Sequence, residues 1–436
     1  MIHQFMEVTL TNTNQYFTRV ASCFTRPNRL RFFLPGVLLL FFFNQSTFAA
    51  VIGKVVQPFA SYNYTADDNI LRIRDKMLPS QLPLQVQSNN FFDMSHRFTG
   101  GLLFEKEISR QRLTANLNWS HTQFDKFSFM DNNLKSASGN WNWFLGNRLE
   151  GNMGASYVQS LAPLLFLSGV KNIRTEQREF INAIWRFHPS WSLHGDYTHY
   201  NLKNSASDIF KFLNRTEDRF EGGIDYLTSG KNTVGVLFRD IIGDFPVLIP
   251  VGSSFADNSY DQKEALAKIN WAISAKSTLS GTGGWVERNN ASFKARNFSG
   301  FNARMTYHWQ PTDKIGLSIT GWRETGAMQQ LTASFSLNTG VRVVPSWDIT
   351  QKIRLEGEFF YQQMKFDRFS VITDAALPLG IHNTLRNSAI KLIYTPYLGL
   401  QLSASIYNNY LKTDSSRGGF DANGANVSVQ YTYGRR

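Results

Sequence analysis

The chain has 436 residues, with 31 glycines, an aromatic share of 14% and only 18% charged residues. Its mean hydropathy of −0.28 excludes a bundle of apolar membrane helices. The composition favours short, glycine-rich strands with aromatic ends over a soluble enzyme, and a closed barrel can reach this length as a single unit.

The first 49 residues have the pattern of a cleavable secretion signal. An apolar run at 32–43 follows three arginines between positions 26 and 31. At about twelve residues, the run is too short to cross a bilayer comfortably as a helix. A small-x-small site at 47–49 completes the pattern of a secretory signal. We therefore expect removal of residues 1–49 and a mature protein of residues 50–436; the alternative is an N-terminal anchor helix.

The signal also carries Cys23, the chain's single cysteine. The predicted mature protein therefore has no thiol, which excludes disulfides, thiolate metal sites and cysteine nucleophiles. Loss of four arginines and one glutamate with the signal lowers the net charge from +12 to +9. After export, nucleic acid is not an expected partner. The relevant polyanions are lipopolysaccharide phosphates and acidic polysaccharides.

Many segments of the mature chain alternate between apolar and polar residues. Segment 352–362 places Ile353, Leu355, Gly357, Phe359 and Tyr361 on one face of a strand, and segments 264–273 and 331–343 follow the same pattern. Inside a membrane the protein must pair its own backbone groups, so only helices or closed barrels can span it. The pattern predicts an all-β fold, a transmembrane antiparallel up-and-down β-barrel with a lipid-facing apolar surface and a polar lumen.

The connections between these segments alternate between short and long. Bacterial barrels have short periplasmic turns and longer extracellular loops. With both mature termini on the periplasmic side, the pattern predicts about 18 strands, the first near 55–64 and the last near 424–433, with 16 and 20 strands as alternatives. One brief connection, near 326–329, departs from the alternation.

An aromatic residue, a short turn and a Leu-x-Gly triplet recur at intervals of roughly forty residues. Tryptophans at such turns predict an aromatic girdle at the inner membrane interface. Ordinary core aromatics are the alternative for these tryptophans, and a propeller, whose blades share the period, is the alternative for the fold. The girdle candidates are Trp143, Trp185, Trp191, Trp271, Trp309 and Trp347.

The sequence contains no nucleophile elbow, P-loop or zinc-protease motif, so we expect no enzyme, no cofactor and no metal site. His194 and Asp196 share a strand face while His199 takes the other, so these groups do not converge on a metal. Glu356 and Glu358 share a face at a range suited to glycoside hydrolysis. The alternative is that they are lumen charges paired with basic neighbours.

A third weak signal follows the first strand. Asp67, Asp68 and Asn69 lie together in a loop and resemble part of a calcium site, but no further ligands follow at loop spacing.

The predicted inward positions carry charges of both signs, with a basic excess. Rings of charge in a water-filled pore determine which solutes pass, so a basic lumen would favour anions. The alternative is that these charges only solvate and brace the lumen. The candidates are Arg178, Arg186, Asp196, Arg219, Glu221, Asp225, Arg239, Glu264, Lys268, Arg304, Arg342, Lys352, Arg354, Glu356, Glu358 and Lys391.

Several short segments resemble one family of exported proteins. They are Tyr62-Asn63-Tyr64 with Asp67-Asp68-Asn69-Ile70-Leu71-Arg72, Arg110-Gln111-Arg112-Leu113, Trp141-x-Trp143-x-Leu145-Gly146, and Gly223-Ile224-Asp225-Tyr226 leading to Arg239-Asp240-x-x-Gly243. Together they resemble EpsL-type outer-membrane proteins of exosortase-associated exopolysaccharide operons. The resemblance extends over most of the mature chain by pattern, and the family supplies no catalytic residues.

The resemblance implies a role in exopolysaccharide biosynthesis or export at the cell outer membrane of a Gram-negative bacterium. The first hypothesis is therefore a passive conduit or accessory, with outer-membrane lipid, lipopolysaccharide, the polysaccharide chain and export machinery as partners. The alternatives are a general or substrate-selective porin for small solutes, and a barrel enzyme acting on glycan or lipid.

Overall fold

The computed structural model describes residues 55–434, apart from residues 79, 81, 83, 87, 89, 163–169, 207–209, 231, 252–253, 293–296, 328–334, 367–381 and 415–417. The predicted signal, residues 1–49, lies outside the described residues, so its removal stays a prediction. Among the described residues, no helix combines the length and apolar character needed to cross a membrane.

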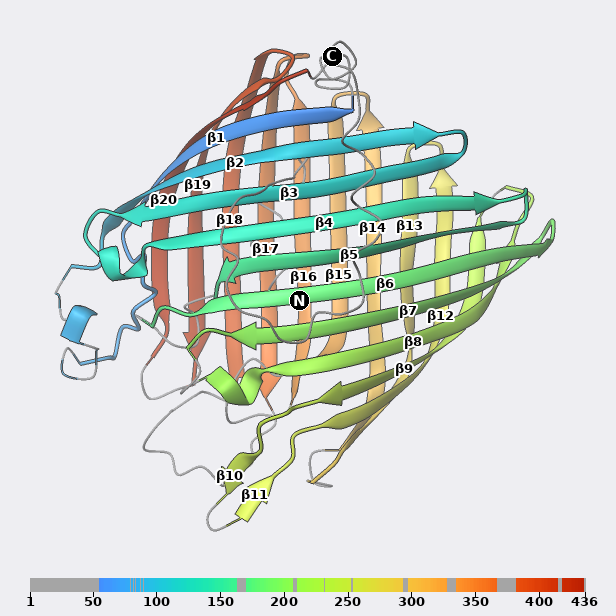
Figure 1. Cartoon of the computed structure of the whole chain (residues 1–436), viewed down its shortest axis with the longest axis horizontal. Helices are drawn as coiled ribbons and strands as arrows, with labels where there is room; N and C mark the ends of the chain where they lie inside the picture. The colour runs from blue at the N-terminus through green and yellow to red at the C-terminus, as the bar shows by residue number, and fades with distance from the viewer. Residues whose placement is uncertain are drawn as a thin grey trace, which may run out of the picture.

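Eighteen antiparallel strands close into one barrel (Figure 1). Strand β1 pairs with β2 on one side and with β20 on the other, which closes the ring. Strand β9 pairs with β12, because β10 and β11 form a separate hairpin between them. The all-β barrel and its strand number are therefore as the sequence predicted.

Figure 1 shows β1 to β9 forming one wall of the barrel and β13 to β20 the opposite wall. The barrel strands are β1 (Val56–Asp67), β2 (Asp93–Ile108), β3 (Gln111–Phe124), β4 (Asn132–Leu145), β5 (Leu149–Leu161), β6 (Ile173–His188), β7 (Trp191–Asn204), β8 (Arg215–Leu227), β9 (Thr233–Asp244), β12 (Tyr260–Ser274), β13 (Ser277–Asn290), β14 (Phe298–Thr312), β15 (Ile315–Ala327), β16 (Phe335–Asp348), β17 (Ile353–Phe366), β18 (His382–Tyr397), β19 (Leu400–Thr413) and β20 (Phe420–Thr432). The remaining elements are the hairpin β10 (Ile249–Val251) and β11 (Ser254–Ala256), and three short 3-10 helices, η2 (Leu84–Val86), η3 (Ser128–Met130) and η4 (Lys211–Leu213).

Short turns join the strands at one end of the barrel and longer connections join them at the other. The long connections include η2, η3, η4 and the β10–β11 hairpin. Since bacterial barrels place long loops outside the cell, we refer to this end as extracellular. The brief connection predicted near 326–329 is longer than expected, because β15 ends at Ala327 and β16 begins only at Phe335. The residues between them lie outside the described part of the chain.

Alternate residues of each strand face opposite sides of the barrel wall. On β17, Phe359 and Tyr361 are 46% and 37% exposed, whereas Phe360, Gln362 and Met364 between and after them are 5% exposed or less. The exposed set contains the large apolar side chains, as a lipid-facing surface requires, and the buried set faces the lumen. The two-residue period of the sequence therefore separates the side chains that face outward from those that face the lumen.

The closing strands are joined at their extracellular end by a cluster around Asp67, the last residue of β1. Arg72 donates to both carboxylate oxygens of Asp67 at 2.8 Å, and the Tyr407 hydroxyl of β19 donates to the same carboxylate at 2.6 Å. Burial alone would lower the pKa of Arg72, but the hydrogen bonds and charge of Asp67 raise it above its ordinary value. We call Asp67, Arg72 and Tyr407 the seam cluster.

The neighbouring polar residues extend this connection to β20. Asp68 accepts hydrogen bonds from the backbone and side chain of Asn423, at 2.8 and 3.1 Å. The Asn69 side chain accepts from the backbone N–H of Ile73 and donates to its carbonyl. The oxygens of Asp67, Asp68 and Asn69, which were considered for a calcium site, accept hydrogen bonds that hold the loop on the barrel seam.

Removing the Asp67 carboxylate should destabilise the barrel strongly. Asp67 is only 1% exposed in its side chain and Arg72 16%, and breaking a buried pair costs about 3 to 5 kcal/mol. We expect Asp67→Ala to lower the free energy of unfolding by about 3 kcal/mol, measured in urea through the gel mobility shift between folded and boiled protein.

The matched control is Glu105→Ala, which removes the partner of Arg112. Both side chains of that pair are 53% exposed, so the loss should stay below about 1 kcal/mol. Equal effects of the two substitutions would contradict a structural role for the seam cluster.

Candidate functional site in the lumen

The lumen-facing residues divide the inner wall into two regions of different chemistry. Strands β6 to β9 and β12 to β18 carry most of the charged side chains, and we call this region the charged wall. Strands β19, β20 and β1 to β5 carry mainly amide and hydroxyl side chains, and we call this region the amide wall. Because neighbouring strands present side chains in register, each wall is a continuous surface.

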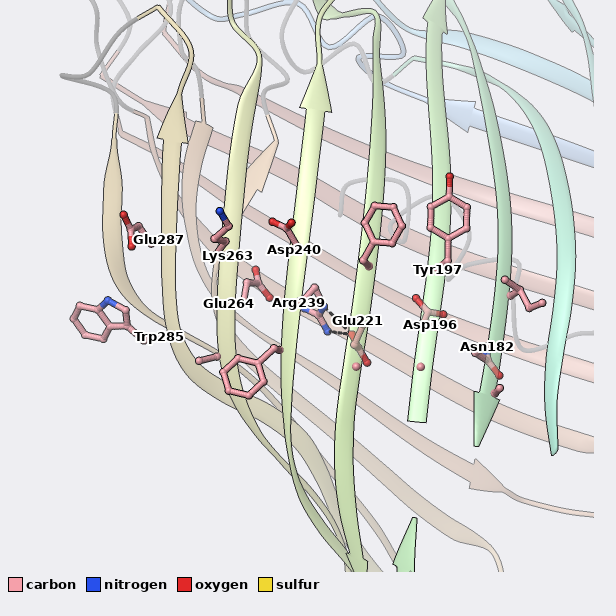
Figure 2. Close-up of a pocket in the computed structure, with 17 residues that line it drawn as sticks. Asn182, Asp196, Tyr197, Glu221, Arg239, Asp240, Lys263, Glu264, Trp285 and Glu287 are labelled. Atoms are coloured by element: carbon pink, nitrogen blue, oxygen red, sulfur yellow. Dashed lines mark hydrogen bonds and ion pairs between the residues drawn. The ribbon is translucent and has the colours of Figure 1, made fainter. Parts of the chain in front are cut away.

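A chain of ion pairs and hydrogen bonds runs along the charged wall. Arg239 of β9 lies between two carboxylates, donating to Glu264 of β12 at 2.7 Å and to Glu221 of β8 at 2.8 Å (Figure 2). Arg239, Glu221 and Glu264 occupy directly opposed positions on neighbouring strands. Their placement follows from strand register, because alternating signs on adjacent strands attract one another.

The chain continues toward both ends of the barrel. On the extracellular side, Gln262 donates to Glu264 at 2.6 Å and accepts from Arg288 at 3.2 Å. Toward the short turns, His194 lies 3.9 Å from Glu221 and 2.8 Å from Asp225. Lys268 completes it with a 3.0 Å contact to Asp225. We call this set the ion-pair chain: Arg288, Gln262, Glu264, Arg239, Glu221, His194, Asp225 and Lys268.

Further ion pairs continue around the charged wall. Arg219 contacts Asp196 at 2.7 Å, and Arg304 contacts Glu324 at 2.7 Å. Glu324 was not among the sequence candidates, although its place in the alternation of β15 puts it on the inner face. These pairs reduce the field that each cation exerts on a passing solute.

The two glutamates considered as a catalytic pair are both engaged by arginines. Arg342 contacts Glu358 at 2.8 Å, and Arg354 contacts Glu356 at 2.8 Å. Lys391 lies directly opposite Glu356 on the neighbouring strand. This arrangement matches the alternative in which the glutamates are lumen charges paired with basic neighbours.

Three other predicted lumen residues differ in their surroundings. Arg186 contacts Glu150 near the short-turn end, and the Arg178 guanidinium lies 5.5 Å from the ring centre of Phe180. Lys352 does not face the lumen, because it lies in the exposed turn before β17. The Thr350 hydroxyl accepts from the backbone N–H of Lys352 and of Ile353, so the strand begins one residue later than the alternation suggested.

The amide wall was not recognised in the sequence. Asn426 donates to Asn63 at 2.7 Å and to Thr65 at 2.8 Å, and Ser403 contacts Ser428 at 2.8 Å. Its signal in the sequence is the alternation of polar residues, but uncharged polar residues in a strand do not by themselves indicate a function. Its inward amide and hydroxyl residues include Ser403, Ser405, Asn409, Asn426, Ser428, Gln430, Ser61, Asn63, Thr65, Ser95, Thr99, Thr114, Asn116, Asn118, Ser120, Thr122, Asn132, Ser136, Ser138, Asn140, Asn142, Asn152 and Ser156.

Arg97 of β2 stands within the amide wall and was also missed. Its Nε donates to the Thr122 hydroxyl at 3.0 Å. The other inward charges described for β19, β20 and β1 to β5 lie at or near the strand ends: Asp67, Asp93, Glu105, Glu107, Arg112 and Glu150. The Arg97 guanidinium therefore presents positive charge to the lumen in otherwise neutral surroundings.

The histidine pair considered for metal binding is divided between the two sides of the wall. His194 faces the lumen and contacts Asp225, whereas His199 faces outward and contacts Asp218 at 2.8 Å. Within the described part of the chain, no group of three or more His, Cys, Asp or Glu side chains is arranged to hold a metal ion.

The outer surface carries the predicted girdle tryptophans near the short turns. Trp185, Trp191, Trp271, Trp309 and Trp347 are between 37% and 51% exposed. Trp143 is less exposed, because its ring packs over Gly151 on the next strand.

A hollow of about 920 Å³ also lies on the outer surface, where Gly195 and Gly222 are opposite one another. Exposed Phe220, Phe238 and Trp285 also line the hollow, and Figure 2 labels Trp285 at its edge on β13. Because these side chains face lipid, the hollow is not a solute site.

No protein-family model matches the chain, and no curated protein matches it. Among solved structures, OccK2 (OpdF) of Pseudomonas aeruginosa is similar with 9% identity and a TM-score of 0.46, covering 86% of this chain and 98% of that one. OccAB3 of Acinetobacter baumannii has 8% identity and a TM-score of 0.43, and the match covers 87% of this chain and 99% of that one. A BenF-like porin from Pseudomonas fluorescens Pf-5 has 9% identity and a TM-score of 0.45, and the match covers 86% of this chain and 98% of that one. These similarities concern the barrel fold only.

The central arginine of the ion-pair chain should be energetically coupled to its carboxylates. In a double-mutant cycle with Arg239→Gln and Glu264→Gln, we expect a coupling free energy of about 0.5 to 3 kcal/mol, the range for residues that share one network. The measurement is urea unfolding of the wild type, both single variants and the double variant in lipid vesicles. Additive losses would show that the contact is not formed.

Proposed function

We propose that the protein is a passive outer-membrane channel for small polar solutes. The observation that carries the proposal is a closed ring of 18 strands whose outward side chains are mainly apolar and whose lumen-facing side carries most of the charged and hydrogen-bonding side chains. A polar inner surface is what a water-filled passage requires. The proposal needs no nucleotide, cofactor or catalytic residue, because solutes move down their own gradients.

The ion-pair chain gives this channel a mixed-charge surface. Arg239 balances Glu221 and Glu264 in one run of contacts, so a solute meets both signs within a few ångströms. A monovalent ion of either sign gains little from such a surface. A polar or zwitterionic solute can exchange its water for donors and acceptors of the wall.

Recordings across planar lipid bilayers test the proposal directly. We expect steady conductance from the mature protein. Arg239→Gln leaves Glu221 and Glu264 without their shared cation and should shift the reversal potential toward cation preference. Glu221→Gln combined with Glu264→Gln should shift it toward anion preference, since Arg239 then lacks both carboxylates.

Lys263→Gln is the matched control, because Lys263 adjoins Glu264 in sequence but faces outward and is 68% exposed. It should leave the reversal potential unchanged. Absence of conductance would overturn the channel proposal. Conductance with the same reversal potential in all variants would show that the ion-pair chain lies outside the conducting path.

The amide wall favours a second candidate, the exopolysaccharide conduit or accessory that the EpsL-type resemblance implies. Amide and hydroxyl groups both donate and accept hydrogen bonds, as sugar hydroxyls do, and they do not bind ions strongly. A surface of Asn, Ser and Thr on seven neighbouring strands therefore suits a neutral or weakly acidic glycan chain.

A deletion strain distinguishes this second candidate. If the protein takes part in exopolysaccharide export, the strain should lose surface polysaccharide and regain it with the wild-type gene. Unchanged polysaccharide in the deletion strain would contradict export and leave the small-solute channel as the function to be tested.

A further inference from the structure

The outer surface of β15 to β19 carries a cluster of basic side chains near the extracellular end. Arg323, Lys365, Arg386 and Lys412 lie on β15, β17, β18 and β19, and we call these four residues the basic rim. They belong to the outward-facing set of each strand, which also contains Tyr361 and Ile390. On the described residues of these five strands, no aspartate or glutamate faces outward.

The strand register brings the basic rim together with neutral hydrogen-bonding groups. Arg323 lies opposite Thr339 and Lys412 opposite Thr384, while Gln363 lies between the two threonines as the partner of both. Neighbouring strands are about 4.8 Å apart. The row therefore offers hydroxyl and amide groups between two cations.

The other two cations flank this row. Arg386 lies two residues from Thr384, toward the membrane, and stacks at 4.9 Å over the ring of Tyr410. Lys365 lies two residues from Gln363, toward the extracellular side. The basic rim is thus a patch two to three rows high, not a single line.

The carboxylates nearest to this patch are engaged by other groups. Asp414 contacts His382 at 3.4 Å, and Asp421 accepts from Asn408 at 2.6 Å. Arg323 donates to the backbone carbonyl of Phe301. Within the described residues, none of the four cations has a carboxylate at ion-pair distance, so their charge is available to an external anion.

The opposite side of the barrel has the reverse charge at the extracellular end of its outer surface. There the outward residues of β6 to β9, β12 and β13 are mainly acidic, and the basic exceptions are His199, Lys203 and Lys263. The acidic residues are Glu179, Asp218, Asp240, Asp244, Asp261 and Glu287. An anion at the membrane surface is therefore attracted to one side of the barrel and repelled from the other.

We propose that the basic rim binds the phosphate groups of a glycolipid in the outer leaflet. The occupant is a lipid because the apolar band begins directly beneath the cations. Ile390 lies four residues from Arg386 on the same face of β18 and is 46% exposed, and Ile406 on β19 is 63% exposed. At about 3.3 Å per residue, a head group at Arg386 places its acyl chains against these side chains.

This inference goes beyond the proposed channel and does not depend on conduction. The test uses the mature full-length barrel in detergent, with native mass spectrometry of bound lipid. The probes are a bis-phosphorylated lipid A and the same lipid after removal of its phosphates. Each cation beside an anionic surface contributes about a factor of five to ten, so Arg323→Gln, Arg386→Gln and Lys412→Gln together should weaken binding of the phosphorylated lipid on the order of a hundredfold.

Lys263→Gln is the control, since it removes an outward cation from the acidic side, and it should leave lipid binding unchanged. Folding of each variant is checked by the gel mobility shift on boiling. If the triple variant does not fold, the comparison of the two lipids on the wild type decides the matter.

Three results would overturn the proposal. The first is equal binding of the phosphorylated and dephosphorylated lipids. The second is an equal loss of binding in Lys263→Gln. The third is full displacement of the lipid by excess inorganic phosphate, which would identify a site for free phosphate instead.

Discussion

The structure depends on one constraint, the pairing of backbone N–H and C=O groups where water is excluded. In lipid, each unpaired group costs several kcal/mol, so a sheet can cross the bilayer only if it has no edge. Here the ring is closed between β1 and β20, two strands at opposite ends of the sequence. The seam cluster lies beside this junction, where Asp67 joins the loop after β1 to Tyr407 of β19.

Closure and alternation together produce two separate chemical surfaces from one chain. Outward residues such as Phe238 need only be apolar, because lipid covers them. Inward residues include apolar side chains such as Phe360 and Met364, but most of the charged groups also lie there, and a partly buried charge needs a partner or water. In the ion-pair chain, side chains of neighbouring strands supply these partners, so the lumen retains charged groups at little cost in desolvation. The amide wall carries neutral groups instead, and Arg97 is its charged exception away from the strand ends.

The sequence predicted those features that depend only on neighbouring positions along the chain. Period-2 alternation in 264–273 and 352–362 identified strands and the side that faces lipid, since each residue's face depends only on its position in the strand. Connection length identified the two ends of the barrel. Lys352 and the brief connection near 326–329 were misplaced because strand ends are set by turn hydrogen bonds, such as those of Thr350, which alternation does not reveal.

The candidate site was less predictable because its contacts join residues that are distant in sequence. Asp67 and Tyr407 are 340 positions apart, and their hydrogen bond is visible only after the ring closes. For the same reason, Asp67, Asp68 and Asn69 resembled part of a calcium site. Glu356 and Glu358 have the spacing of a catalytic pair, but the register brings Arg342 of β16 to Glu358, and Arg354 contacts Glu356 along β17. Sequence showed which groups face inward but not which groups satisfy one another.

The most direct test of the account is whether adjacent residues of one strand face different solvents. Ala137 and Ser138 are neighbours near the middle of β4, and the predicted mature chain has no cysteine of its own. In barrels reconstituted into lipid, a membrane-impermeant maleimide should label Ser138→Cys, which faces the lumen, and should leave Ala137→Cys, which faces lipid, largely unlabelled. Equal labelling of the two positions would contradict a closed barrel with a lipid-facing and a lumen-facing side.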